Sequence, residues 1–157
     1  MPLMSRKVDY ALLILSHLYS KPGGACAREV ADRFQLSRAF VANILKELCH
    51  KGFVASHRGV KGGYIVQRPV AQVSLAELLD ALDDPFHLAE CTRLPPDCGC
   101  NVATICPVRE PIAEVHRRIR DLLVNVTLAE VFRPLTSACQ DQCGQTPALQ
   151  AVGLNKV

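Results

Sequence analysis

Apolar residues recur at helical spacing three times within the first fifty positions. They recur every three or four residues over 8–19 and again over 27–34, which predicts two amphipathic helices. A Lys-Pro-Gly-Gly sequence at 21–24 ends the first helix, because proline and glycine do not continue one. Ser37 is a suitable N-cap for a third helix that reaches about Lys51. The side chains expected to face the core from this helix are Phe40, Val41, Ile44, Leu45 and Leu48.

The pattern after the third helix predicts a short hairpin. Gly52 stops the helix, and two runs suited to β-strands follow at 53–57 and 64–66. They flank Arg58-Gly59-Val60-Lys61-Gly62-Gly63, a glycine-rich segment suited to a tight turn. Three helices with a tight turn before the third, followed by a hairpin, is the element order of a winged helix-turn-helix domain.

Helical periodicity returns in the second half of the chain, on both sides of a cysteine-rich segment. Capping-box sequences at 74–77 and 127–130 open two short helices. A long amphipathic helix lies between them, from about Pro107 or Pro111 to Asn125. The sequence therefore predicts a mainly α fold, in which a winged helix-turn-helix domain is followed by a long C-terminal dimerisation helix. The predicted divisions are a DNA-binding domain at 1–84, a cysteine-rich cluster loop at 85–106, dimerisation helices at 107–134 and a flexible tail at 135–157.

Composition and charge narrow the function. Apolar residues make up 49% and charged residues 21%, which is ordinary for a soluble globular protein. No apolar run is long enough for a membrane span, and the N-terminus lacks a secretory pattern, so we expect a cytoplasmic protein without a membrane partner. The net charge of +3 divides into +7 over residues 1–68 and −4 over residues 69–157. This asymmetry suits a nucleic-acid-binding domain joined to a second part, although an ordinary solvated surface also explains it.

The polar face of the third helix and the glycine-rich turn carry the candidate DNA-binding residues. In helix-turn-helix proteins, exposed residues near the start of the third helix reach base edges in the major groove. Asn43 is the best candidate for reading bases, because its amide both donates and accepts hydrogen bonds at adenine. Arg58 would respond to the negative potential of a minor groove. The other candidates are Ser37, Arg38 and Lys46 for phosphates, Ala39 for close approach, and Lys61, Gly62 and Gly63 in the wing. Taken singly, each is better explained as a solvated surface residue.

Eight cysteines are many for a chain of 157 residues in a reducing compartment. Cys91, Cys98, Cys100 and Cys106 lie within sixteen residues, which favours metal ligation over a disulfide framework. Thiolates on a loop suit an iron–sulfur cluster. Four thiolates also suit structural zinc, and a thiol–disulfide switch is a third alternative. No nucleophile–base pair or phosphate-binding loop indicates an enzyme, whereas a small metalloprotein or electron carrier remains a competing class.

Several motifs occur together in one order and carry a family resemblance. In that order they resemble the Rrf2 family of bacterial winged helix-turn-helix regulators, of the IscR and NsrR type, over about residues 1–134. The motifs are Val8-Asp9-Tyr10-Ala11, Leu36-Ser37 followed by Phe40, Gly52-Phe53-Val54-Ala55-Ser56, Arg58-Gly59-Val60-Lys61-Gly62-Gly63-Tyr64, Ser74-Leu75-Ala76-Glu77, the cysteine cluster and Asn125-Val126-Thr127-Leu128-Ala129.

The resemblance implies a transcription regulator, expected to be a repressor, that binds a partly palindromic double-stranded DNA operator as a homodimer. The dimer contact would involve the long helix at about 111–125. Family members with three spaced cysteines hold a 2Fe-2S or a 4Fe-4S cluster whose state alters DNA affinity, and we favour 2Fe-2S here. The expected signal is redox stress, nitric oxide or iron–sulfur status.

The resemblance also assigns ligands by position. Cys91 and Cys106 match the outer cysteines of the family triplet. Either Cys98 or Cys100 matches the middle one, and Cys100 fits slightly better because of its gap to Cys106. A histidine ligand of some relatives is replaced here by Arg109. Asp9 matches an acidic ligand of other relatives, supplied there by the partner subunit, although it could equally stabilise the start of its own helix.

Overall fold

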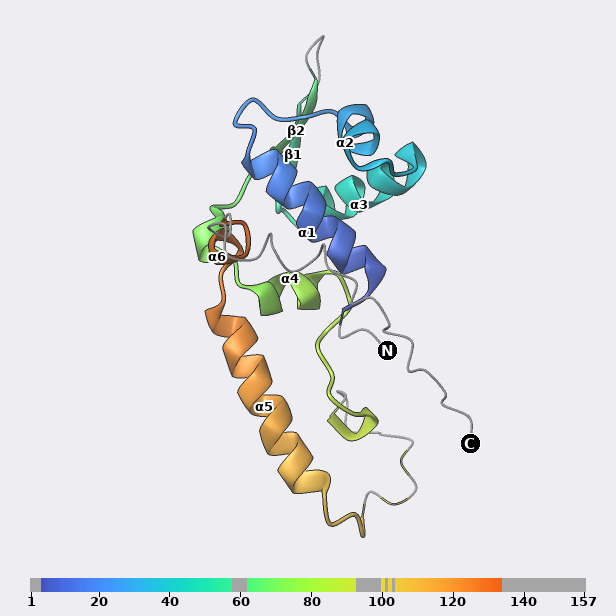
Figure 1. The fold of residues 1–157 in the computed structure, drawn as a ribbon, viewed down its shortest axis with the longest axis vertical. Helices are drawn as coiled ribbons and strands as arrows, with labels where there is room; N and C mark the ends of the chain where they lie inside the picture. The colour runs from blue at the N-terminus through green and yellow to red at the C-terminus, as the bar shows by residue number, and fades with distance from the viewer. Residues whose placement is uncertain (1–3, 58–61, 93–99, 101, 103, 134–157) are drawn as a thin grey trace, which may run out of the picture.

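The structure is a computed structural model that describes residues 4–57, 62–92, 100, 102 and 104–133. Figure 1 shows a body of short helices with a small hairpin, from which one long helix extends as an arm. The mainly α, winged-helix fold predicted from the sequence is confirmed. None of the helices in the described ranges is both long enough and apolar enough to cross a bilayer. The elements are α1 (Arg6–Tyr19), α2 (Ala27–Phe34), α3 (Arg38–His50), β1 (Val54–His57), β2 (Gly63–Val66), the 3-10 turn η1 (Val70–Gln72), α4 (Leu75–Ala81), the 3-10 turn η2 (Glu90–Thr92), α5 (Arg109–Asn125) and α6 (Leu128–Val131).

Polar side chains cap the helices at the predicted positions. The Ser37 hydroxyl accepts a hydrogen bond at 3.3 Å from the backbone of the third residue of α3. Thr127 and Glu130 form a complete capping box, with hydrogen bonds of 3.3 and 2.8 Å. In the other predicted box, the Glu77 carboxylate accepts instead from Arg68 at 2.6 Å. Local sequence therefore fixes where these helices begin.

One hydrophobic core joins the winged helix to the segment that follows the arm. Leu128 of α6 is only 1% exposed and belongs to the same buried cluster as the side chains of α1 and α3. Two backbone hydrogen bonds of 2.9 Å fasten this region, from the Leu75 amide to the Val126 carbonyl and from the Leu128 amide to the Val73 carbonyl. Backbone pairing of the residues that follow α5 therefore holds the body end of this helix.

The wing root is clamped to the turn between α1 and α2. Strands β1 and β2 pair antiparallel, and Ala25 extends the ladder by exchanging hydrogen bonds of 3.1 and 2.9 Å with Tyr64. The backbones approach so closely that a Cβ on Gly24 would lie 2.7 Å from the Tyr64 carbonyl oxygen. A Cβ on Gly63 would lie 2.9 Å from the Ala25 carbonyl oxygen. Glycine at both positions is therefore a condition of this packing.

The structure corrects one core assignment and adjusts several bounds. Phe40 was expected to be buried but is 36% exposed, because its ring lies edge-on against Tyr10 of α1, 5.2 Å between centroids, at the margin of the core. α1 begins at Arg6, two residues before the predicted start at position 8. α5 begins at Arg109, so Pro111 lies in its first turn, where proline is tolerated.

Candidate nucleic-acid interface and cysteine segment

The recognition-type helix α3 presents the predicted polar residues on one side. Val41, Ile44, Leu45 and Leu48 are buried and fix the rotation of α3 about its axis. That rotation leaves the opposite side exposed, and spacings of four and three residues place three predicted positions on it. The exposed residues are Arg38, Ala39, Asn43 and Lys46, with the cap residue Ser37 at the start of the helix.

One of these residues already has a partner. The Arg38 guanidinium lies 3.4 Å from the Asp32 carboxylate of α2, and both side chains are largely exposed. An ion pair this long and this accessible to water is worth little. Arg38 can therefore exchange Asp32 for a phosphate at small cost.

The wing lies at the same end of the molecule as α2 and α3. Figure 1 shows the β1–β2 hairpin and these two helices opposite the arm. Gly62 and Gly63 are half-exposed at the wing root. The predicted wing residues Arg58 and Lys61 lie outside the described residues. The helix and the wing root thus form one candidate nucleic-acid surface.

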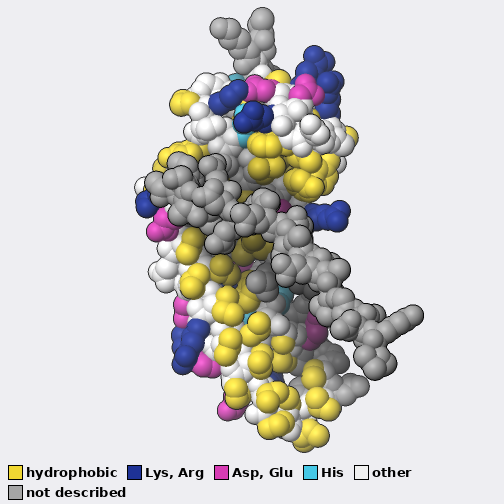
Figure 2. All heavy atoms as spheres, in the orientation of Figure 1, with side chains coloured by type: hydrophobic (Ala, Val, Ile, Leu, Met, Phe, Trp, Pro, Cys, Tyr) yellow, Lys and Arg dark blue, Asp and Glu magenta, His cyan; other side chains and the backbone are white. Residues whose placement is uncertain are grey.

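Two basic residues of α2 escaped the sequence analysis. Arg28 and Arg33 are exposed on this helix, and Figure 2 shows Lys and Arg side chains gathered at the wing end of the molecule. The first helix of a helix-turn-helix pair crosses the DNA backbone in known complexes. The sequence signal that could have identified them was the presence of basic residues on α2, the first helix of the helix-turn-helix pair.

The cysteine segment leads into the arm. Cys91 lies in η2, and Cys100 and Cys106 lie before α5; all three are free thiols and half-buried. Cys98 lies outside the described residues. Across the described ranges, no three His, Cys, Asp or Glu side chains are grouped closely enough to hold a metal ion. Cysteine thiolates are suitable ligands for iron or zinc. The described cysteines, however, are not assembled into such a group within one chain.

Asp9 is remote from the cysteines within one chain. It is exposed in the first turn of α1, where a carboxylate stabilises the helix N-terminus. Figure 1 shows α1 in the body, whereas the segment leading into α5 lies at the far end of the arm. The structure therefore does not bring Asp9 and Cys106 together in a single copy.

A stack of aromatic rings fixes the chain before Cys91 against the arm. His116 of α5 lies nearly parallel to Phe86, 5.4 Å between ring centroids, and nearly parallel to His87, at 6.3 Å. Its Nδ1 accepts a hydrogen bond from the Leu88 amide at 3.4 Å, which requires an unprotonated Nδ1. Burial first, and then the charges of His87 and Arg120, lower the pKa of His116. The sequence analysis did not assign this junction.

A largely exposed apolar stripe runs along the arm, and Ile119 within it also packs against the core. Within the described chain, α5 contributes no fully buried residue. Val108, Val115 and Leu122 are 56%, 44% and 59% exposed, and Ile112 and Ile119 are half-buried between them. The spacings alternate between four and three residues, the pattern of a helix that packs along another helix. Figure 2 shows hydrophobic side chains gathered along this arm.

Three helices, a wing and an exposed polar face on α3 define the class as a winged helix-turn-helix protein. Comparison with known proteins supplies the family. Residues 4–134 match the profile of the Rrf2 family, described as iron-dependent transcriptional regulators. The chain belongs to the Rrf2 family, which confirms the resemblance found in the sequence. The family is one of transcription regulators and not of enzymes.

Curated relatives and solved structures agree with this assignment. A putative rrf2-like HTH-type transcriptional regulator of Rhodobacter capsulatus is 29% identical over 83% of this chain and 92% of its own length. The HTH-type transcriptional regulator IscR of Serratia proteamaculans is 26% identical over 73% of this chain and 68% of its own length.

Two solved structures share the fold at lower identity. T. potens IscR superposes with a TM-score of 0.64 at 21% identity, over 88% of this chain and 91% of that one. CymR, the global cysteine regulator of B. subtilis, gives a TM-score of 0.64 at 22% identity, over 84% of this chain and 97% of that one.

Proposed function

We propose that the chain is a homodimeric repressor that binds a double-stranded DNA operator under the control of an iron–sulfur cluster. The exposed polar side of α3 beside the wing root carries the DNA-binding part of this proposal. Asn43 reads a base, Ala39 permits close approach, and the wing enters the neighbouring minor groove. The phosphate contacts come from Ser37, Arg38 and Lys46, and the wing contacts from Arg58, Lys61, Gly62 and Gly63.

The apolar stripe of α5 supports the homodimer. A helix with exposed valines and leucines at alternating spacings of three and four residues is stable in water when a second apolar surface covers it. A second copy offers an identical stripe, and a two-fold contact is self-complementary. Two copies joined through α5 present two recognition helices, as a partly palindromic operator requires.

The cysteines supply the donor set for the cluster. Cys91 and Cys106 would hold it with Cys100, or with Cys98 as the alternative middle ligand, and Asp9 of the partner subunit would complete the set. When bound, a 2Fe-2S cluster, or the 4Fe-4S alternative, supplies a redox-sensitive link between these side chains. The three described thiols are free and half-buried, which keeps them available for ligation.

Exposed apolar residues near both parts of the proposed site support a contact between copies. Val102 and Ile105 beside Cys106 are 50% and 79% exposed. Leu13 lies one helical turn after Asp9 and is also exposed, beside the Tyr10–Phe40 ring pair. Figure 1 shows α1 in the body and the segment before α5 at the far end of the arm, so the two surfaces would meet between two copies.

Such a contact would link the cysteine segment to DNA binding. Phe40 belongs to α3 and lies one residue from Ala39 on the exposed side. A partner segment docked on Tyr10 and Phe40 would hold α3 against α1, and release of that segment would remove this support. The proposed regulation therefore acts through a direct contact with the recognition helix.

Anaerobic spectroscopy and DNA binding test the two parts of the proposal separately. Freshly purified protein should show visible charge-transfer bands with iron and sulfide present, and Cys91→Ser should lose them. Cys26→Ser is the matched control, because Cys26 is a free thiol outside the segment and serine suits its position as the N-cap of α2. A colourless protein with stoichiometric zinc would show a structural metal site, and loop cysteines that cycle between thiol and disulfide would show a redox switch; either result overturns the cluster.

DNA binding is measured on duplexes selected from a randomised pool with the wild-type protein. Lys46→Ala should reduce the slope of log affinity against log salt by about 0.9, since one phosphate contact is lost. Asn43→Ala should cost about 1–3 kcal/mol and relax the preference at one base pair. Arg118→Ala is the charge-matched control on the arm and should leave the slope unchanged. Salt-independent binding would favour the electron-carrier alternative.

A further inference from the structure

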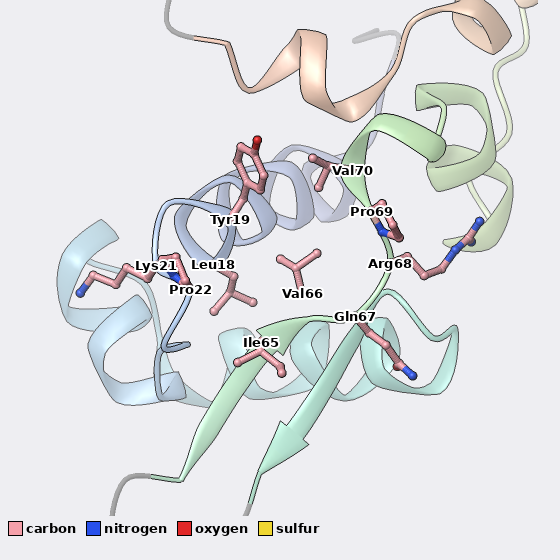
Figure 3. A pocket seen from close by; sticks show the side chains of 10 residues that line it. All are labelled: Leu18, Tyr19, Lys21, Pro22, Ile65, Val66, Gln67, Arg68, Pro69 and Val70. Atoms are coloured by element: carbon pink, nitrogen blue, oxygen red, sulfur yellow. The ribbon is translucent and has the colours of Figure 1, made fainter.

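A groove of about 390 Å³ lies behind the wing, on a part of the surface that the proposed function does not use. It runs between the end of α1 and the segment from β2 into η1. Figure 3 shows apolar side chains converging on it, whereas the polar ends of Lys21 and Arg68 point away. The apolar side chains that line it include Leu18, Tyr19, Ile65, Val66, Pro69 and Val70.

The described chain ends beside this groove. Tyr19 at the rim is 51% exposed, and its ring lies 6.0 Å from that of Phe132, tilted by 38°. α6 also contacts η1, which forms the far wall. Arg133 is the last described residue before the tail. An extended chain covers at most about 3.6 Å per residue, so the chain length limits the distance between the Cα atoms of Arg133 and Leu135 to about 7 Å.

The chemistry of the tail suits the groove. Residues 134–157 contain two charged side chains, Asp141 and Lys156. The first five residues, Pro-Leu-Thr-Ser-Ala at 134–138, contain none. A leucine three residues beyond Phe132, which contacts the aromatic rim, gains free energy by leaving water for an apolar groove.

We propose that the segment 134–138 of the same chain docks in this groove, with Leu135 packed against Ile65 and Val66. This contact would cover the apolar side chains of β2 that line the groove, and it would brace the wing root. The family profile ends at residue 134, so the contact would be an addition of this chain to the shared fold. The proposal is independent of the cluster and of the dimer.

A single tryptophan reports on the groove. The chain contains no tryptophan, so Tyr19→Trp places one fluorophore at the rim of the groove in the otherwise unchanged full-length protein. Leu135→Asp in this background should move the emission to longer wavelength and increase iodide quenching, because the indole becomes exposed. Leu149→Asp is the matched control, with the same change fourteen residues further along the tail, and should change neither signal.

The remaining outcomes overturn the proposal. Unchanged emission and quenching in Leu135→Asp would show that the segment does not cover the groove. Equal changes in both aspartate variants would assign the contact to another part of the tail. If the emission of Tyr19→Trp with an unchanged tail shifts when the protein is diluted, the groove is covered by a second copy. Hydrogen exchange of the β2 amides, measured with Tyr19 intact, should accelerate in Leu135→Asp alone; unchanged exchange also counts against the contact.

Discussion

Gly24→Ala and Gly52→Ala form a matched pair that tests whether the wing root must be clamped to the α1–α2 turn. Both glycines have φ of +78°, so either substitution places an alanine in the left-handed region. A Cβ at Gly52 would meet nothing within 4 Å. A Cβ at Gly24 would lie 2.7 Å from both the Ile65 Cγ2 and the Tyr64 carbonyl oxygen. The two variants therefore share backbone strain and differ in the displacement of β2.

The magnitudes follow from these contacts. Left-handed strain costs about 1–2 kcal/mol in each variant. Gly24→Ala adds an overpacking cost of about 1–3 kcal/mol, because a backbone carbonyl must move. With about 2–4 °C per kcal/mol for a chain of this size, Gly52→Ala should lower Tm by about 2–8 °C, and Gly24→Ala should lower it further.

Thermal unfolding at one protein concentration measures the stability of both variants. Affinity for the selected duplex is then measured at a temperature where both are folded. Gly52→Ala should bind as the wild type does, whereas Gly24→Ala should bind more weakly because the wing root is displaced. Equal melting of the two variants would refute the clash, and wild-type affinity in Gly24→Ala would refute the role of the clamp.

Three further outcomes are expected. Leu122→Glu should convert the protein to a monomer in sedimentation, whereas Ala113→Glu on the opposite side of α5 should not; a monomeric wild type would contradict the α5 dimer. Thr127→Ala should cost about 1 kcal/mol of unfolding free energy in denaturant titration, because it removes the cap of α6; no loss would show that tertiary packing alone positions this helix. Because the pKa of His116 is lowered from its usual value near 6.5, the unfolded chain binds more protons just below that pH, so stability should fall as the pH drops through 6.5. His116→Phe should flatten this dependence of Tm on pH, and an unchanged slope would assign it to other groups.

Local rules made the body of the fold predictable from the sequence. The caps at Ser37 and Thr127 act within three residues, and Gly52 ends α3 through its own backbone, so each is visible in a short window of sequence. Phe40 shows the limit of such rules. Its spacing matches the buried residues of α3, but the angle at which α1 crosses α3 decides its burial, and that angle is a tertiary property.

Long-range contacts account for what the sequence did not predict. The Glu77 carboxylate accepts a hydrogen bond from Arg68, nine residues away, and not from its expected capping partner. The hydrogen bond between His116 and Leu88 spans 28 residues and has no sequence signature. The charge of Arg28 can be related to DNA binding only when α2 is known to lie at the wing end of the molecule. The described cysteines are not grouped within one chain, so the sequence predicts candidate ligands but not how they would be brought together.

The arm would couple the two proposed functions, because it is fastened at its body end and, near its middle, to the chain that leads to Cys91. At the body end, the pairing of Leu75 with Val126 and of Leu128 with Val73 joins α5 to the core that positions α3. Toward the other end, His116 holds the chain that leads to Cys91. A dimer formed along α5 would therefore set the distance between two recognition helices through packed, hydrogen-bonded segments. A change in the cysteine segment would also alter this distance through α5, in addition to the proposed direct contact with α3.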